Sequence, residues 1–121
     1  MLCESVDLDL SRRPVISVII PVFNSAKYLE ECLCSVSSQT LSNIEILLVI
    51  DGNVDSSNDI VQRYCSQEAR ARAFVNDNNM GVAFSRNRGI ENSKGDYIAF
   101  LDADDKYPTQ DSLETVSYTH L

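Results

Sequence analysis

The residues best suited to chemistry are four aspartates that directly follow two apolar runs. Asp51 follows the first run, and three more follow the second: Asp102, Asp104 and Asp105. Crowded carboxylates repel one another unless a cation or hydrogen-bond donors compensate for their charge. Mg²⁺ and Mn²⁺ prefer oxygen ligands, and proteins commonly hold them with one or two carboxylates and substrate phosphates. If the fold brings the two runs together, the four carboxylates are expected to converge on one rim that binds such a cation.

Each of these aspartate motifs, taken alone, can also be explained as an ordinary turn. Asp102-Ala103-Asp104 is also typical of a solvated turn after a strand, and Asp51-Gly52 is typical of a tight turn. An EF-hand loop is excluded, because Tyr107 stands where that loop needs Gly and Leu113 where it needs Glu. The dinucleotide fingerprint and the phosphate loop ending in Gly-Lys-Ser/Thr are both absent, which argues against NAD and P-loop ATPase chemistry.

Histidine and cysteine chemistry have little support. His120 is the only histidine and lies near the end of the chain, so a Ser-His or Cys-His pair is not expected. The cysteines show no C-x-x-C spacing, which predicts reduced, structural thiols rather than zinc ligands or a disulfide framework. These cysteines are Cys3, Cys32, Cys34 and Cys65.

Charge and length narrow the class of protein. The 121 residues allow one domain, and 18 acidic against 10 basic side chains give a net charge of −8. This charge repels nucleic acid and anionic lipid surfaces. No apolar run approaches the ~18 residues of a membrane span, and acidic residues interrupt the N-terminus where a signal peptide needs an apolar core. The expected location is therefore cytoplasmic, with no nucleic-acid partner and no membrane segment.

Strand-like and helix-like segments alternate along the chain. In order, we expect a strand over 15–20 stopped by Pro21, a helix over about 25–38 capped by Asn24 or Ser25, a strand over 44–50, and a helix capped by Asp55 or Ser56. We then expect a weaker strand over 71–75, a helix over about 82–93 terminated by Gly95, and a strand over 96–101. This alternation predicts an α/β fold with a parallel sheet. Ligands bind such sheets at the carboxyl ends of the strands, where the aspartates fall.

Six segments, in this order, closely resemble successive motifs of the family 2 glycosyltransferases, and together they cover most of the chain. They are 15–24 (VISVIIPVFN), 39–46 around Gln39-Thr40, Asp51-Gly52 with 55–57, Asn79-Met80-Gly81, 85–90 (SRNRGI) and 95–105 (GDYIAFLDADD).

The resemblance implies a GT-A fold, a Rossmann-like parallel sheet with alternating helices. It also implies transfer of a sugar from a nucleotide diphosphate donor, UDP-linked, to a glycan, lipid or protein acceptor, with inversion and with Mg²⁺ or Mn²⁺. We assign residues 14–115 to the donor-binding part, 1–13 to a lead-in and 116–121 to a non-native tail. The chain is thus expected to be a truncated, N-terminal half.

The resemblance implies that four residues bind the nucleotide of the donor: Pro21, Phe23, Asn24 and Asp51. Phe23 matches an aromatic position that lies beside the base, where its ring can stack. Asp51 matches an aspartate that hydrogen-bonds the base, and a carboxylate can accept the imide N–H of uracil. The family pattern has two consecutive aspartates here, of which Asp51 matches the second. Ile50 stands in place of the first, which is the more variable of the two.

On the sugar and phosphate side, Asp102 is expected near the ribose or donor sugar, and Asp104 on the metal that bridges the phosphates. Asp105 is a second candidate for the metal. Arg86 is a donor-side contact, because guanidinium can bind phosphate in a bidentate manner. An equally simple role for Arg86 is to pair with Asp51 or Asp102 and hold the rim together.

Two hypotheses follow. An inverting transfer needs a general base, which the resemblance places downstream of the D-x-D strand, beyond the last residue of this chain. The first hypothesis is that the chain is part of a sugar transferase. The alternative is that the 121 residues alone are an inactive module that binds a nucleotide diphosphate and a metal.

Overall fold

The structure is a computed structural model that describes residues 14–52 and 56–113. The predictions made for 1–13, for Asp55 and for 116–121, including His120, lie outside these described residues. None of the helices in the described part is long and apolar enough to cross a bilayer.

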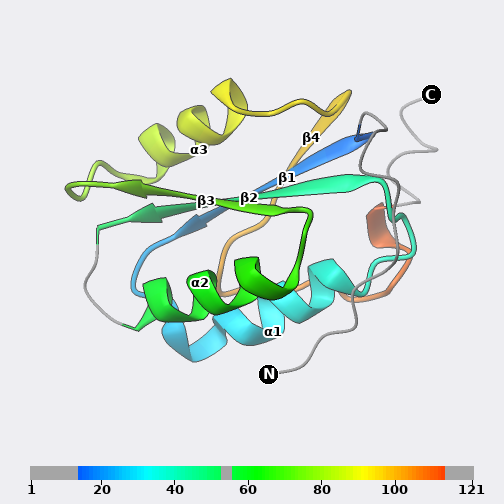
Figure 1. Cartoon of the computed structure of the whole chain (residues 1–121), viewed down its shortest axis with the longest axis horizontal. Coiled ribbons are helices and arrows are strands. Elements are labelled where there is room, and N and C mark those ends of the chain that lie inside the picture. The colour runs from blue at the N-terminus through cyan, green and yellow to red at the C-terminus, as the bar shows by residue number, and fades with distance from the viewer. Residues whose placement is uncertain (1–13, 53–55, 114–121) are drawn as a thin grey trace.

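The described residues form a four-stranded parallel sheet in the order β3-β2-β1-β4. The elements are β1 (Ile16–Val22), α1 (Ala26–Ser37), β2 (Ile44–Asp51), α2 (Ser57–Gln67), β3 (Ala71–Asn76), α3 (Val82–Glu91) and β4 (Tyr97–Phe100). Helices α1 and α2 cover one face of the sheet, and α3 lies on the other (Figure 1). Every predicted strand and helix within the described residues is present, and the α/β prediction is confirmed.

The main core lies between the sheet and the pair α1 and α2. Alternate residues of β1 and β2 face it, because side chains on a strand point to opposite faces in turn. The helical stripe predicted for α1 is fully buried there: Leu29, Cys32, Leu33 and Val36. The opposite face buries Ile19, Leu47 and Val49, so the two central strands are covered on both sides.

The sequence predicted that Pro21 stops the first strand, and this prediction is wrong. Strand β1 continues through Pro21 to Val22. The amide of Leu101 donates to the carbonyl of Ile19, so Ile19 faces β4 with its backbone. Pro21 lies two residues further and faces the same side, where β4 has already ended. Its missing N–H therefore costs no ladder hydrogen bond, which is where a strand tolerates proline.

The predicted side-chain caps are also wrong in detail. Ser25 precedes α1 and Ser56 precedes α2, but neither side chain bonds to a helix amide. Instead, the Ser25 hydroxyl donates to the carbonyl of Phe23 at 2.8 Å, and the Ser25 amide donates to the Ser57 hydroxyl at 3.1 Å. The second of these bonds joins the starts of α1 and α2.

Gly95 does not terminate α3, which ends at Glu91. It lies against β1 instead, where its amide donates to the Ser17 hydroxyl at 2.8 Å. A Cβ at Gly95 would stand 2.7 Å from both the amide nitrogen and the hydroxyl of Ser17. Gly89 allows α3 to approach β1 in a similar way, since a Cβ added at this position would lie 2.5 Å from Ile19 Cγ2. Both glycines hold the α3 layer tightly on β1.

Replacing Gly95 with alanine is expected to lower the free energy of unfolding by about 1–3 kcal/mol, the usual cost of overpacking. Two of the three nearest atoms, the Ser17 amide nitrogen and the Ile16 carbonyl carbon, belong to the β1 backbone and cannot move aside as a flexible side chain would. Urea unfolding of Gly95→Ala measures the loss, with exposed Glu91→Ala on α3 as the control. Equal stability of Gly95→Ala and the unaltered chain would contradict the close approach.

Candidate functional site

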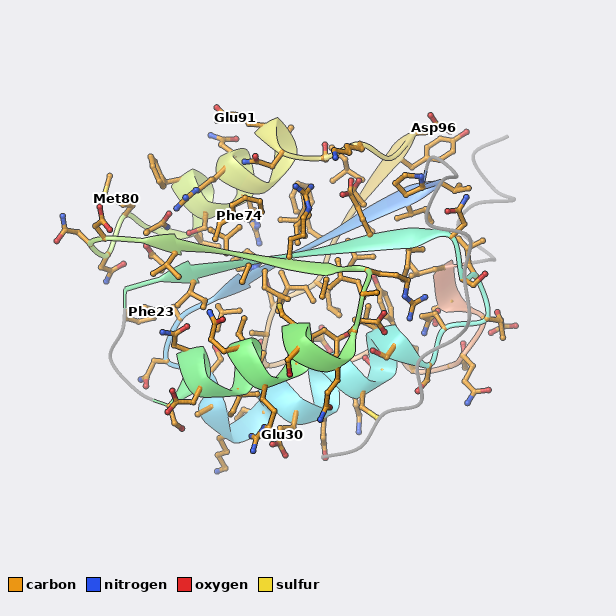
Figure 2. The ribbon with its side chains drawn as sticks, in the orientation of Figure 1. Phe23, Glu30, Phe74, Met80, Glu91 and Asp96 are labelled. Atoms are coloured by element: carbon orange, nitrogen blue, oxygen red, sulfur yellow. The ribbon has the colours of Figure 1, made fainter. Side chains whose placement is uncertain are left out.

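A cavity of about 470 Å³ opens at the carboxyl ends of the strands, between the β1–α1 turn, the start of α3 and the turn after β4. Figure 2 shows Phe23 and Met80 at this end of the molecule and Asp96 at the opposite end. Most of the predicted site residues line the cavity: Pro21, Phe23, Asn24, Asp51, Asp102 and Asp104. Arg86 and Asp105 do not line it.

Asp51 ends β2 and is almost fully buried, at 4% exposure. Its Oδ1 accepts the Met80 amide at 2.7 Å and the Asn76 side-chain amide at 3.1 Å. Its Oδ2 accepts the Gly81 amide at 2.9 Å. The carboxylate therefore holds the loop that leads from β3 into α3 in place along one wall of the cavity.

These three hydrogen bonds also set the charge of Asp51. Burial alone would raise the pKa of this carboxyl, but the bonds from Met80, Asn76 and Gly81 together outweigh it and hold the pKa below its ordinary value. Asp51 is therefore a fixed anion at neutral pH, whose charge is already compensated by protein donors.

The β1–α1 turn presents an aromatic ring to the cavity. Phe23 is 47% exposed although it is a large apolar side chain. Asn24, the next residue, has a φ of 48°, a left-handed conformation that asparagine tolerates better than most residues. The sharp turn at Asn24 and the hydrogen bond to the Phe23 carbonyl keep this ring at the cavity mouth, with a face open for stacking.

The turn that carries Asp102 and Asp104 is anchored on α1. The amide of Asp105 donates to the carbonyl of Asp102 at 2.9 Å and closes the turn. The Cys32 thiol also donates to that carbonyl, at 3.7 Å, and the Tyr107 amide donates to the Ser35 hydroxyl at 3.0 Å. The two cavity carboxylates are thus positioned by backbone contacts to a helix and not by their own side chains.

The Cys32 thiol beneath this turn is inert. Burial, and after it the carboxylates of Asp105, Asp104 and Asp102, raises its pKa to about 12. A thiol with such a pKa stays protonated at neutral pH and is neither a nucleophile nor a metal ligand. The three cysteines in the described residues are all free, in agreement with the prediction of structural thiols.

From the sequence, Arg86 on α3 could pair with Asp51 or with Asp102, and in the structure it pairs with Asp102. Its Nη2 lies 3.4 Å from Asp102 Oδ1, and its guanidinium lies 5.6 Å from the centroid of the Phe100 ring. Both side chains of the ion pair are substantially exposed, at 41% and 60%. Exposed pairs of this kind contribute about 0–1 kcal/mol, so an anionic ligand can compete for Arg86 at low cost.

Of the four carboxylates expected at one rim, Asp51, Asp102 and Asp104 line the cavity and Asp105 does not. Asp51 is engaged by protein amides, and Asp105 lies outside the cavity, where its Oδ1 accepts the Lys106 amide at 2.8 Å. No group of three or more side chains suited to hold a metal ion occurs in the described part of the chain. Asp102 and Asp104 remain, and two carboxylates at a cavity edge fit a cation that takes its other ligands from phosphates.

Three residues at the site were not predicted from the sequence. Ser85 lines the cavity from α3, Tyr28 lines it from α1, and Asn76 contacts Asp51 from the end of β3. Asn76 is a polar residue at the end of a strand, which is the signal that singled out the aspartates. Ser85 and Tyr28 sit within helical patterns and carry no comparable signal.

Comparison with known proteins gives a consistent result. A family model described as Glycosyl transferase family 2 matches residues 17–118. An uncharacterized glycosyltransferase of Haemophilus influenzae is 41% identical over 101 residues, covering 84% of this chain and 40% of that protein. The uncharacterized glycosyltransferase EpsJ of Bacillus subtilis is 44% identical over 92 residues, covering 76% of this chain and 26% of EpsJ. The chain therefore spans less than half of the length of either relative.

A solved structure described as S. aureus TarS 1-349 in complex with UDP-GlcNAc superposes with a TM-score of 0.79 and 27% identity. The match covers 86% of this chain and 30% of that one. With the parallel sheet, this similarity confirms the expected GT-A fold class.

Proposed function

This chain belongs to glycosyl transferase family 2, and from that premise we propose that its cavity binds the nucleotide of a nucleotide diphosphate sugar. The whole protein would transfer that sugar to an acceptor hydroxyl. The carrying observation is the convergence of Phe23, Asp51, Asp102 and Asp104 on one cavity at the carboxyl ends of the strands. TarS, a structural relative, is described with UDP-GlcNAc bound.

The hydrogen bonds of Asp51 favour a uracil base. A carboxylate offers about four acceptor positions, and three of those of Asp51 are taken, two on Oδ1 and one on Oδ2. The remaining position suits the single imide N–H of uracil. Guanine presents two adjacent N–H donors that need both oxygens. The Phe23 ring would stack on the base, an interaction of about 1–3 kcal/mol.

Asp104, with Asp102 near the ribose or sugar, would hold a divalent cation together with the donor phosphates. Such a cation, Mg²⁺ or Mn²⁺, neutralises charge on the departing nucleotide diphosphate. Arg86 is close enough to this edge to exchange its weak pair with Asp102 for a phosphate oxygen. Pro21 and Asn24 shape the turn that bounds the cavity on the β1 side.

The reaction class proposed for the whole protein is an inverting transfer to a glycan, lipid or protein hydroxyl. Its general base would lie outside the residues described here. By itself, the 121-residue chain would bind the donor nucleotide and the metal.

Calorimetric titration of the chain with UDP and with GDP, each with Mn²⁺, tests the base assignment. UDP is expected to bind at least about tenfold more tightly, because an unpaired buried donor costs about 1–3 kcal/mol. The same titrations in EDTA should show much weaker binding. Equal affinities for UDP and GDP would reject the role of Asp51, and no binding of either nucleotide would reject the proposed function.

A further inference from the structure

Asn76 has no role in the proposed site, yet it contacts the residue that would read the base. It is the last residue of β3, opposite Asp51 in the strand register, and only 3% exposed. Its Nδ2 donates to Asp51 Oδ1 at 3.1 Å and to the Ser85 hydroxyl oxygen at 3.0 Å. Both partners line the cavity, whereas Asn76 does not.

Arg88 fixes which way the Asn76 amide points. Its Nη1 donates to Asn76 Oδ1 at 2.9 Å and to the Val75 carbonyl at 2.8 Å. A flipped amide would set its NH₂ group against the guanidinium and its oxygen against the Asp51 carboxylate. Both new contacts would be repulsive, so only one orientation satisfies every partner.

The bond from Asn76 occupies one acceptor position on Oδ1 that a ligand could otherwise use. With the Met80 amide on the same oxygen, it leaves Oδ2 as the oxygen with a position to spare. We propose that Asn76, oriented by Arg88, is a positioning residue that directs Asp51 to accept one hydrogen bond from the donor base. This inference rests on the proposed function and extends it to a residue outside the cavity.

Asn76→Asp is the most informative variant, because it keeps the shape and replaces the amide donor by an ionisable carboxyl. At about pH 8 two ionised carboxylates would face each other, and the pair would shift Asp51 and the loop amides that it holds. As the pH is lowered the pair takes up a proton, and an O–H then replaces the lost N–H donor. Arg88, which contacts residue 76, opposes this uptake. The charged groups around this pair are Arg88, Asp77, which follows residue 76 in the chain, and Asp102 and Asp104, which line the same cavity as Asp51.

We therefore expect Asn76→Asp to weaken binding of Mn²⁺ and UDP, relative to the unaltered chain at the same pH, about tenfold more at about pH 8 than at about pH 5.5, since one pKa unit corresponds to a tenfold change. Comparison at the same pH removes the titration of the UDP terminal phosphate. Binding of Mn²⁺ and inorganic pyrophosphate, which carries no base, should match that of the unaltered chain at both pH values. Asn78→Asp, an exposed change of the same charge in the same loop, is the matched control and should show neither effect.

The outcomes separate the two proposals. A pH-dependent loss confined to UDP supports the positioning role. A loss that is equal for UDP and pyrophosphate, or one that does not vary with pH, overturns the positioning role and leaves the proposed function intact. If the unaltered chain binds no UDP, both proposals are overturned.

Discussion

Replacing Asp104 with alanine is expected to weaken binding of UDP in the presence of Mn²⁺ by about 100-fold or more. Loss of a residue that only supports a metal ligand commonly costs about 10–100-fold, and a direct ligand should cost at least as much. Only two carboxylates at the cavity, Asp102 and Asp104, are free of protein amides, so little remains to replace the lost ligand. Titration calorimetry with UDP, with and without Mn²⁺, measures this effect.

Two further variants sharpen this test. Asp96→Ala removes a carboxylate at the opposite end of the sheet (Figure 2) and should leave the affinity for UDP unchanged. Asp105→Ala removes the second candidate for the metal, which lies outside the cavity, and should cost less than Asp104→Ala. A Mn²⁺-dependent affinity that survives in Asp104→Ala would contradict the assignment of the metal to this residue.

Replacing Arg70 with methionine is expected to lower the free energy of unfolding by about 3–5 kcal/mol, because it strands a buried charge. Arg70 and Glu68 form an ion pair at 2.9 Å, with side chains only 1% and 2% exposed. Arg70 also donates to the carbonyls of Ser42 and Ser37, at 3.0 and 3.4 Å. The pair therefore joins the end of α2 to the neighbouring α1–β2 connection.

The pH dependence gives this prediction a second readout. Burial would raise the pKa of Glu68, but hydrogen bonds and charge from Arg70 outweigh it and hold the pKa below its ordinary value. Glu68 thus contributes stability that is present above its unfolded pKa of about 4.3 and is lost as the pH falls through the lower folded pKa. Without Arg70, burial dominates and the carboxyl becomes neutral more easily.

The loss in Arg70→Met should therefore be largest near neutral pH and should shrink as the pH falls. The shrinkage begins above the unfolded pKa of about 4.3, where the buried carboxyl of the variant becomes neutral, and it ends as the pH falls through the lowered folded pKa of Glu68 in the unaltered chain. Urea unfolding at several pH values measures it. Arg63→Met is the control, since Arg63 pairs with Glu30 on the surface and such pairs contribute about 0–1 kcal/mol. A difference of the same size at every pH would contradict the role of the charge.

The sequence predicted the sheet because its signals are local. The apolar run of β2 and the spacing of Leu29, Cys32, Leu33 and Val36 each require one kind of element, whatever surrounds them. The rule that polar residues gather at the carboxyl ends of parallel strands then placed Asp51 and Asp102 together. The strand order confirms the sheet, and Asp51 and Asp102 line one cavity.

The remaining features depend on the path of the chain in space. The sequence could not indicate that Asp51 accepts the amides of Met80 and Gly81, about thirty positions away, because backbone donors are present at every residue. Nor could it separate Asp104, at the cavity, from Asp105, outside it, since the two are identical neighbours. Gly95 was predicted to terminate a helix because glycine is common at helix ends. Its actual contact, with Ser17, lies 78 positions away and leaves no local signal in the sequence.

The pairing of β1 with β4 has a consequence for the order of assembly. The first and last strands of the sheet are direct neighbours, and the bond between Ser17 and Gly95 spans 78 positions. Contacts between segments so distant in sequence form slowly, because a long loop must close before they stabilise anything. As the chain leaves the ribosome, Asp51 is made well before the segment that carries Asp102 and Asp104. We therefore expect the cavity to be completed late in folding, when β4 pairs with β1.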